Sequence, residues 1–427
     1  MMRKRMTRVA VALTAAVAMT GCSTNGDGGD EPLPNTDNER KYIELTRAEQ
    51  ALVTNNNDFA FNLFRRMTFS GPAGPCFESP KSEIVSPISI TYALGMLNNG
   101  AAGQTQAEIN KVLGFGNTGA QGINDFCRKM LTEAPALDNL TTVRIANTIF
   151  LNKDYQLKSD FVDKAKTCYG AVPETRNFAD GKTLGVINQW ASDHTEKMIE
   201  KILDEDEFRP GAVSYLLNAI YFKGAWSEKF DKKNTKDETF KGYAGQKTVP
   251  MMHQEHEFGY LREDGFQVLS LPYGNGAYDM TILLPDEGKT VAEVLSPLTA
   301  EKWRRLRYVR TALVDVKLPR FESKSGIDLV DIMTALGMPS AFSPETAEFP
   351  EFCNVPTFIG QMKQAARIKL NEEGTEAAAV TLIGDFVSAA APSEPQRVQF
   401  HATRPFLYVI SEQSTGAIFF IGQYMGE

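Results

Sequence analysis

The order in which helical and strand-like patterns follow one another constrains the fold of this chain more than any other feature. Apolar residues repeat with a helical period mainly in the first half, at 57–67, 123–131, 161–168 and 184–201. Runs typical of β-strands dominate the second half and comprise 142–151, 213–222, 279–284, 311–318, 406–411 and 417–422. Helices and strands that segregate in this way, with no second linker, are typical of α+β domains rather than of βαβ repeats. We therefore predict one α+β domain over residues 43–427.

The first 21 residues have the pattern of a secretory signal peptide. An apolar run at 9–19 is too short to cross a bilayer as a helix. It is preceded by four cations, Arg3, Lys4, Arg5 and Arg8. Their removal would leave 41 of the 45 basic residues against 53 acidic ones, so the net charge would change from −8 to −12. Such acidity argues against nucleic acid as a partner, because binding phosphates requires cations.

Cys22 directly follows the sequence Met-Thr-Gly at the end of the apolar run. This arrangement resembles the lipobox of bacterial lipoproteins, with Met19 in place of the usual Leu or Val, although an ordinary signal peptide remains an alternative. The resemblance implies that residues 1–21 are removed and that Cys22 is lipidated and anchors the protein to a membrane. Residues 22–42 are rich in Gly, Asp, Asn and Pro and are expected to form a flexible tether. We expect an exported outer-membrane lipoprotein that is periplasmic or exposed at the cell surface.

The remaining cysteines show no CxxC spacing, so the sequence predicts neither a zinc site nor a thioredoxin-like site. These residues are Cys76, Cys127, Cys168 and Cys353. An oxidising compartment would allow up to two disulfides. A bridge between Cys76 and Cys127 is one alternative, and free buried thiols are the other.

The sequence also lacks the common catalytic patterns. It has no GxSxG motif, and its two Gly-Lys-Thr triplets, at 181–183 and 288–290, lack the earlier glycine of a phosphate-binding loop. His253 and His256 form an HxxH pattern, but their flanking residues indicate a strand, where the two side chains would face opposite sides. We therefore predict no enzyme activity, no cofactor and no metal site.

Motifs spread from about Leu45 to Gln423 make the chain resemble the serpin family. They occur in the family's order at 86–90 (SPISI), 94–96 (LGM), 103–113, 218–226 (NAIYFKGAW), 249–252 (VPMM), 283–285 (LLP), 318–321 (LPRF), 371–379 (NEEGTEAAA) and 404–407 (RPFL). The resemblance implies a large mixed β-sheet, two smaller sheets, about eight to nine helices and an exposed reactive-centre loop. It also implies a suicide inhibitor whose loop, once a target protease has cut it, inserts into the large sheet with the protease covalently attached.

The hinge of the reactive loop corresponds to a stretch of small residues that is compatible with insertion. The resemblance assigns this hinge to Glu372, Gly374, Thr375, Glu376, Ala377, Ala378 and Ala379. If Thr375 is the first inserted residue to face inward, alternate residues give an inward face without charges, and Glu376 faces solvent. Gly374 provides the backbone freedom that a hinge needs. A solvated Ala-rich linker is the alternative interpretation of this stretch.

A polar cluster that controls opening of the large sheet is also implied by the resemblance. Its members here are Ser86, Ser89, Asn218, Trp226 and Gln364. Members of the family commonly have a histidine where this chain has Gln364. Since Gln can donate and accept hydrogen bonds at once, we expect the network to be preserved, but without the pH response of a histidine.

Counting from hinge residue Glu372 places the reactive bond between Ser388 and Ala389, with Phe386 and Val387 as alternatives. A count back from Pro405 gives Glu394 instead, so this loop is longer than usual. The small apolar residues around Ser388 favour elastase- or subtilisin-like targets and disfavour trypsin-like ones, while Phe386 leaves chymotrypsin- or papain-like proteases open.

We thus expect an inhibitory serpin, monomeric, whose partner is the target protease. Its acidity argues against heparin activation. A non-inhibitory serpin that serves as a binding or structural surface protein is the alternative.

Overall fold

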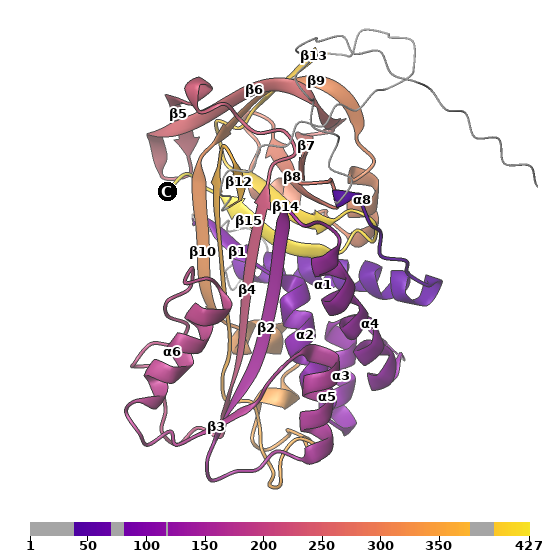
Figure 1. Cartoon of the computed structure of the whole chain (residues 1–427), viewed down its shortest axis with the longest axis vertical. Helices are drawn as coiled ribbons and strands as arrows, with labels where there is room; N and C mark the ends of the chain where they lie inside the picture. Colours follow the sequence, from indigo (N-terminus) through magenta and orange to yellow (C-terminus); the bar gives the residue numbers. More distant parts are fainter. Residues whose placement is uncertain (1–37, 70–80, 117, 376–396) are drawn as a thin grey trace, which may run out of the picture. The chain divides into compact units, whose positions relative to one another are not determined.

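The computed structural model describes residues 38–69, 81–116, 118–375 and 397–427, and Figure 1 shows their arrangement. The helices are α1 (Arg47–Thr68), α2 (Pro87–Asn98), α3 (Gly103–Val112), α4 (Gly119–Glu133), α5 (Ser159–Tyr169), α6 (Thr183–His194), α7 (Val291–Leu295), α8 (Ala300–Leu306) and α9 (Val330–Leu336). The strands of the first two thirds of the chain are β1 (Glu83–Val85), β2 (Thr141–Asn152), β3 (Glu174–Arg176), β4 (Ser214–Ala225), β5 (Lys236–Gly242), β6 (Gly245–Glu263), β7 (Phe266–Tyr273) and β8 (Tyr278–Pro285). The later strands are β9 (Arg310–Pro319), β10 (Phe321–Asp328), β11 (Met362–Asn371), β12 (Gly374–Thr375), β13 (Arg397–His401), β14 (Phe406–Glu412) and β15 (Ile418–Tyr424).

Six strands form one mixed sheet in the order β10-β11-β12-β4-β2-β3. Its centre has an unusual construction, because one edge of β11 pairs with β10 and the other edge is shared by two strands, β4 and β12. Residues 362–366 of β11 run parallel to residues 216–220 of β4, whereas the end of β11 pairs with the two-residue strand β12. Strand β12 in turn pairs antiparallel with the end of β4. The two long strands are therefore in direct contact along one half and separated by a short strand in the other (Figure 1).

Nine strands form the second network, with the path β1-β15-β14-β8-β7-β6-β9-β13 and β5 paired to β6. The long strand β6 pairs with β5, β7 and β9 at different points along its length. The two smaller sheets expected from the resemblance are thus continuous with each other through β6.

The six-stranded sheet is covered on both faces by apolar side chains. On one face lies α2, in which all residues are buried, as expected for a helix that is apolar all round. Pro87 begins this helix at a position where its missing N–H costs nothing. On the other face, Trp190 of α6 and Leu203 pack against Leu217 of β4 in a separate cluster. Neighbouring residues of β4 alternate between the two clusters, so both faces of this strand are buried.

The predicted elements are present, and their boundaries reveal one error. Strands β2, β4, β8, β9, β14 and β15 coincide with the six predicted runs. Helix α6, however, ends at His194 rather than at residue 201. Glu196 and Lys197 have φ angles of 49° and 62°, in the left-handed region, which a right-handed helix cannot contain. The helical period continues past the end because Ile199 and Leu203 still pack beneath the helix.

Three further predictions concern the chain ends and cysteines. Cys127, Cys168 and Cys353 are free and buried, which agrees with the second alternative and contradicts a bridge between Cys76 and Cys127. The Asn38 amide donates to Asp138 Oδ1 at 2.9 Å, so contacts with the folded unit begin before residue 43. No helix among the described residues is long and apolar enough to cross a membrane. The predicted signal peptide, Cys22 and Cys76 lie outside the described residues.

Candidate functional site: the seam between β4 and β11

The line along which β4 and β11 meet, here called the seam, brings together most of the predicted site residues that the structure describes. In its closed half, residues 216–220 pair directly with residues 362–366. In its open half, the last residues of both strands flank β12. We describe the open half first, because it leads into the segment 376–396, which lies outside the described residues.

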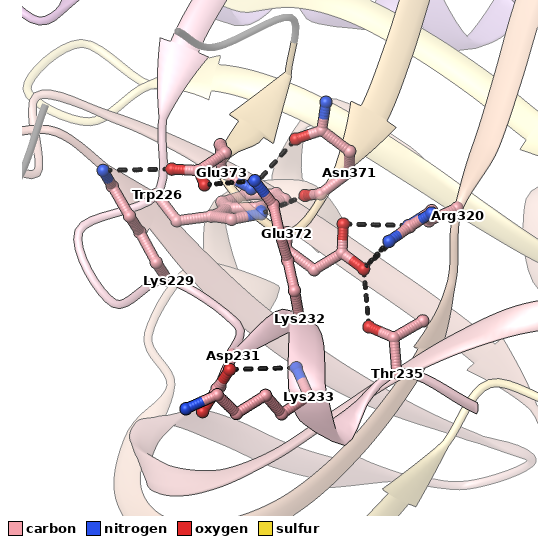
Figure 2. Close-up of polar contacts among 10 residues, drawn as sticks. All are labelled: Trp226, Lys229, Asp231, Lys232, Lys233, Thr235, Arg320, Asn371, Glu372 and Glu373. Carbon is pink, nitrogen blue, oxygen red and sulfur yellow. Dashed lines mark hydrogen bonds and ion pairs between the residues drawn. The ribbon is translucent and has the colours of Figure 1, made fainter. Parts of the chain in front are cut away.

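Charged groups surround the open half where β11 ends (Figure 2). The carboxylate of Glu372 accepts hydrogen bonds from Arg320 Nε at 2.7 and 2.8 Å and from the Thr235 hydroxyl. Glu373 lies 3.2 Å from Lys229 Nζ and 3.0 Å from Lys232 Nζ. Each of the two adjacent glutamates is therefore neutralised by its own cations.

These partners shift the acidity of both glutamates. Burial by itself would raise the pKa of Glu372, but the hydrogen bonds from Arg320 and Thr235 outweigh it and hold the pKa below the ordinary value. Hydrogen bonds from Lys232 and Lys229 likewise lower the pKa of Glu373. Both side chains are thus held as carboxylates at neutral pH.

Trp226 connects the turn after β11 to the end of β4, as Figure 2 shows. Its backbone N–H donates to Glu373 O at 2.9 Å, and its indole Nε1–H donates to Asn371 O at 3.0 Å. The indole ring stacks on Tyr273 with a centroid distance of 4.5 Å. This predicted residue therefore fixes the point at which the chain turns from β11 into β12.

Gly374 and Thr375 occupy the open half as β12. Gly374 has a φ angle of +142°, and a Cβ there would lie 2.0 Å from Gly224 O, so no other residue fits. The Thr375 side chain is fully buried, and its hydroxyl lies 2.7 Å from the hydroxyl of Tyr273. Thr375 is therefore buried before any further insertion, and β12 already lies between the two long strands.

The closed half contains a buried network of neutral amides. Gln364 on β11 donates through Nε2 to Asn218 Oδ1 at 2.7 Å, across the seam. It also accepts from Ser86 N–H at 2.9 Å and donates to Ser86 O at 3.0 Å. Asn218 donates to Ser89 O at 3.1 Å and to Asn147 Oδ1 at 2.7 Å. Gln364 thus takes part in the network that the sequence predicted for it.

The two serines contribute differently from what their residue type suggests. Both act through backbone groups, and the Oγ atoms of Ser86 and Ser89 have no hydrogen-bond partner among the described residues. Asn147, which the sequence reasoning missed, lies opposite Asn218 in the register of β2 and β4. Its only signal was an amide side chain within a largely apolar strand.

Some predicted residues lie outside the described part of the chain. These are hinge residues Glu376, Ala377, Ala378 and Ala379 and the reactive-bond residues Phe386, Val387, Ser388 and Ala389. Among the described residues, no group of three His, Cys, Asp or Glu side chains could hold a metal ion. The two histidines of the HxxH pattern both lie on β6 and contact different partners: His253 contacts Asp315 of β9, and His256 contacts Glu228.

The register of β12 defines how a longer strand would have to enter the seam. Thr375 pairs with Gly224 on one side and with Leu370 on the other, antiparallel to both strands. A strand extended in this register would separate residues 216–220 from residues 362–366 and break the hydrogen bond between Gln364 and Asn218. Side chains of such a strand would alternate between the two apolar faces. A longer strand in this register would therefore have to open the pairing between β4 and β11.

Comparison with known proteins identifies relatives of this chain. The family model described as "Serpin (serine protease inhibitor)" matches residues 54–426. Serpin B6 of Macaca fascicularis is 33% identical over 382 residues, which cover 87% of this chain and 98% of that protein. Leukocyte elastase inhibitor of Equus caballus is 31% identical over 388 residues, which cover 88% and 99% of the two chains. The native-state structure of tengpin, a thermophilic serpin, superposes with a TM-score of 0.78 at 27% identity and covers 91% of this chain and 97% of that one.

Proposed function

The chain belongs to the serpin family, and from this premise we propose that it is a suicide inhibitor of serine endopeptidases rather than an enzyme. Serine protease inhibition in general is supported by its serpin relatives, among them an elastase inhibitor. The proposed partner is a target protease, which attacks the segment 376–396 and becomes covalently attached to it. We propose that the inhibitor is a monomer and needs neither a cofactor nor heparin.

The position of β12 is the observation that carries this proposal. Gly374 and Thr375 already pair with both β4 and β11, so the loop needs only to continue along an existing register. Its first inward side chain is small and buried. Cleavage would release the far end of the segment 376–396, allowing the strand to extend into the seam. Gain of a central strand then provides the free energy that traps the protease before its acyl-enzyme hydrolyses.

Elastase- and subtilisin-like proteases are the proposed targets. The residues nearest the predicted bond between Ser388 and Ala389 are small or apolar, and no Lys or Arg occurs until Arg397. A small residue before the bond fits a shallow primary pocket, whereas trypsin-like pockets require a cation. Phe386 extends the proposal to chymotrypsin- or papain-like enzymes if that residue precedes the cleaved bond.

The proposed location is outside the cytoplasm on a membrane anchor. The cations and apolar run before Cys22 support an exported lipoprotein, tethered through residues 22–42 to the outer membrane. Radiolabelled fatty acid should be incorporated into the full chain and not into a Cys22→Ser variant. Equal labelling of both proteins would contradict lipidation at Cys22.

Incubation with elastase tests the inhibitory function. A denaturing gel should show a band at the summed mass of inhibitor and protease, and elastase inactivated at its serine should give none. Mass spectrometry of the released C-terminal peptide would then locate the reactive bond. Quantitative cleavage without the covalent band would instead identify a non-inhibitory serpin that uses the same fold for binding.

A further inference from the structure

Two of the four histidines of the chain meet at one carboxylate, away from the seam. His253 of β6 places Nε2 2.7 Å from Asp315 Oδ1, and His401 of β13 places Nε2 3.3 Å from Asp315 Oδ2. Asp315 lies on β9, between the other two strands. The cluster therefore links three adjacent strands through a single acidic side chain.

Strand β13 depends on this cluster more than the other two strands do. Among the described strands, β13 pairs only with β9 and ends the sheet path. Of its five residues, only Phe400 is buried in the core. Val398 is partly buried against the same core, and the polar side-chain contacts of β13 are the ion pair between Arg397 and Glu255 and the contact of His401 with Asp315. A short edge strand with few attachments opens readily.

The two histidines contact Asp315 in different ways. His253 forms a hydrogen bond, which a neutral imidazole can also donate. His401 Nε2 is buried and is not aligned for a hydrogen bond, so its contact with the carboxylate is electrostatic. That contact becomes an ion pair only when the imidazole carries a proton. An imidazole in water gains its proton at about pH 6.5, and the added charge strengthens its interaction with a carboxylate.

The charged groups around the cluster are paired with one another. Lys317 of β9 is paired with Glu238 of β5, and its Nζ lies 2.8 Å from each carboxylate oxygen. Arg397 of β13 is paired with Glu255 of β6. Glu257 lies two residues further along β6. Burial by itself would raise the pKa of Asp315, but its contacts with the imidazoles hold that pKa below the ordinary value. Asp315 is therefore a carboxylate throughout the range in which histidines titrate.

We propose that His401, Asp315 and His253 form a pH-dependent clasp, which holds β13 to β9 more firmly at mildly acidic pH than at alkaline pH. β13 carries the C-terminal attachment of the segment 376–396, so the clasp controls how easily that attachment detaches. This device is separate from the seam, and the detachment of β13 can be measured whether or not the protein inhibits a protease.

One consequence rests on the proposed function. In the β12 register, residues 375–385 would pair with β4 down to Ser214, a depth of about 33 Å. Without cleavage, residues 386–396 would have to return over that depth with a maximum reach of about 38 Å. Insertion of an uncut loop would therefore pull on β13. A firmer clasp at low pH should slow this spontaneous loss of activity.

Hydrogen exchange of the Arg397–His401 amides at pH 6 and pH 8 tests the clasp, with rates corrected for the intrinsic pH dependence of exchange. We expect about three- to tenfold higher protection at pH 6 in the unmodified chain. His401→Gln, which keeps polarity but cannot be protonated, should remove this difference. His256→Gln is the matched control, because His256 lies on β6 but contacts Glu228 instead.

The outcomes separate the clasp from the inhibitory function. A pH difference that persists in His401→Gln, or that is absent from the unmodified chain, overturns the clasp. A difference that disappears in His401→Gln and persists in His256→Gln supports it, even if no covalent complex with elastase forms. His253→Gln should reduce the difference only in part, since that contact is a hydrogen bond in either protonation state.

Discussion

The two halves of the seam between β4 and β11 differ in the interactions that hold them. The open half is bordered by ion pairs of Glu372 and Glu373 and contains only a two-residue strand. The closed half is held by direct strand pairing and by buried neutral amides, and it contains one ion pair, between Lys363 and Glu207. A charged, partly exposed border tolerates movement and water, whereas a buried amide network resists separation until every partner is replaced. We therefore expect insertion to begin in the open half and the closed half to resist it.

Thr375→Arg should have the largest effect on insertion, because its side chain blocks the open half. A guanidinium in the fully buried position of Thr375 lacks a carboxylate partner, at a cost of several kcal/mol. We expect the variant to be cleaved by elastase without forming a covalent complex. Glu376→Arg is the matched control, since that residue is predicted to face solvent and should leave inhibition intact. Retained inhibition by Thr375→Arg would show that the inward face is wrongly assigned.

Gln364→Ala should weaken the closed half. The substitution leaves Asn218 Oδ1 and the Ser86 N–H without a partner in a buried site. We expect the free energy of unfolding of the uncut protein to fall by about 1–3 kcal/mol, together with faster spontaneous insertion. Denaturant titration measures the first effect, and loss of activity over time measures the second.

Gln364→His is the control for that prediction. A histidine can restore part of the network, so stability at neutral pH should lie closer to that of the original protein. It should also add a pH dependence near neutrality that the glutamine lacks. Equal losses in the alanine and histidine variants would argue that side-chain volume, and not hydrogen bonding, stabilises the closed half.

Acidic pH should loosen the border of the open half. Because the pKa values of Glu372 and Glu373 are lowered in the folded protein, their stabilisation is present above the ordinary pKa of a glutamate. It is lost as the pH falls from about 4.5 through the lowered values. Glu372→Gln should reduce this loss and destabilise the protein at pH 7 by about 1–2 kcal/mol. The stability of the two proteins between pH 3 and 7 provides the measurement, and parallel curves would contradict the assignment.

Tyr273→Phe should have the smallest effect. It removes the hydroxyl that lies 2.7 Å from Thr375 but keeps the ring that stacks on Trp226. We expect a loss of about 1 kcal/mol and unchanged inhibition, since Thr375 stays on its inward face. Hydrogen exchange at Gly374 and Thr375 should rise slightly. A complete loss of inhibition would mean that the hydroxyl pair, rather than the strand register, positions β12.

The sequence was sufficient for features that depend on neighbouring residues. The apolar periods predicted the second half of α1, α4, α5 and most of α6, whereas the hinge at Gly374 and Thr375 was assigned from the resemblance to the serpin family. Gly374 could be predicted because a positive φ and close backbone contact permit only glycine. These features need no knowledge of distant partners.

Partners far apart in the chain could not be predicted in the same way. Arg320 precedes Glu372 by 52 residues, and Tyr273 precedes Thr375 by 102. Asn147 contacts Asn218 across 71 residues. Each of these side chains lies in a strand or turn with ordinary composition, and only the register of the sheet brings it to its partner. The serine hydroxyls show the converse, because their residue type suggested a contact that their backbones make instead.

Thermal unfolding before and after a single cut within residues 376–396 tests the central claim most directly. If the seam accepts the cut loop as a new strand between β4 and β11, the cut protein should unfold at a markedly higher temperature than the uncut one. Thr375→Arg, cut in the same way, should show little of this increase. An unchanged unfolding temperature after cleavage of the original protein would contradict insertion into the seam.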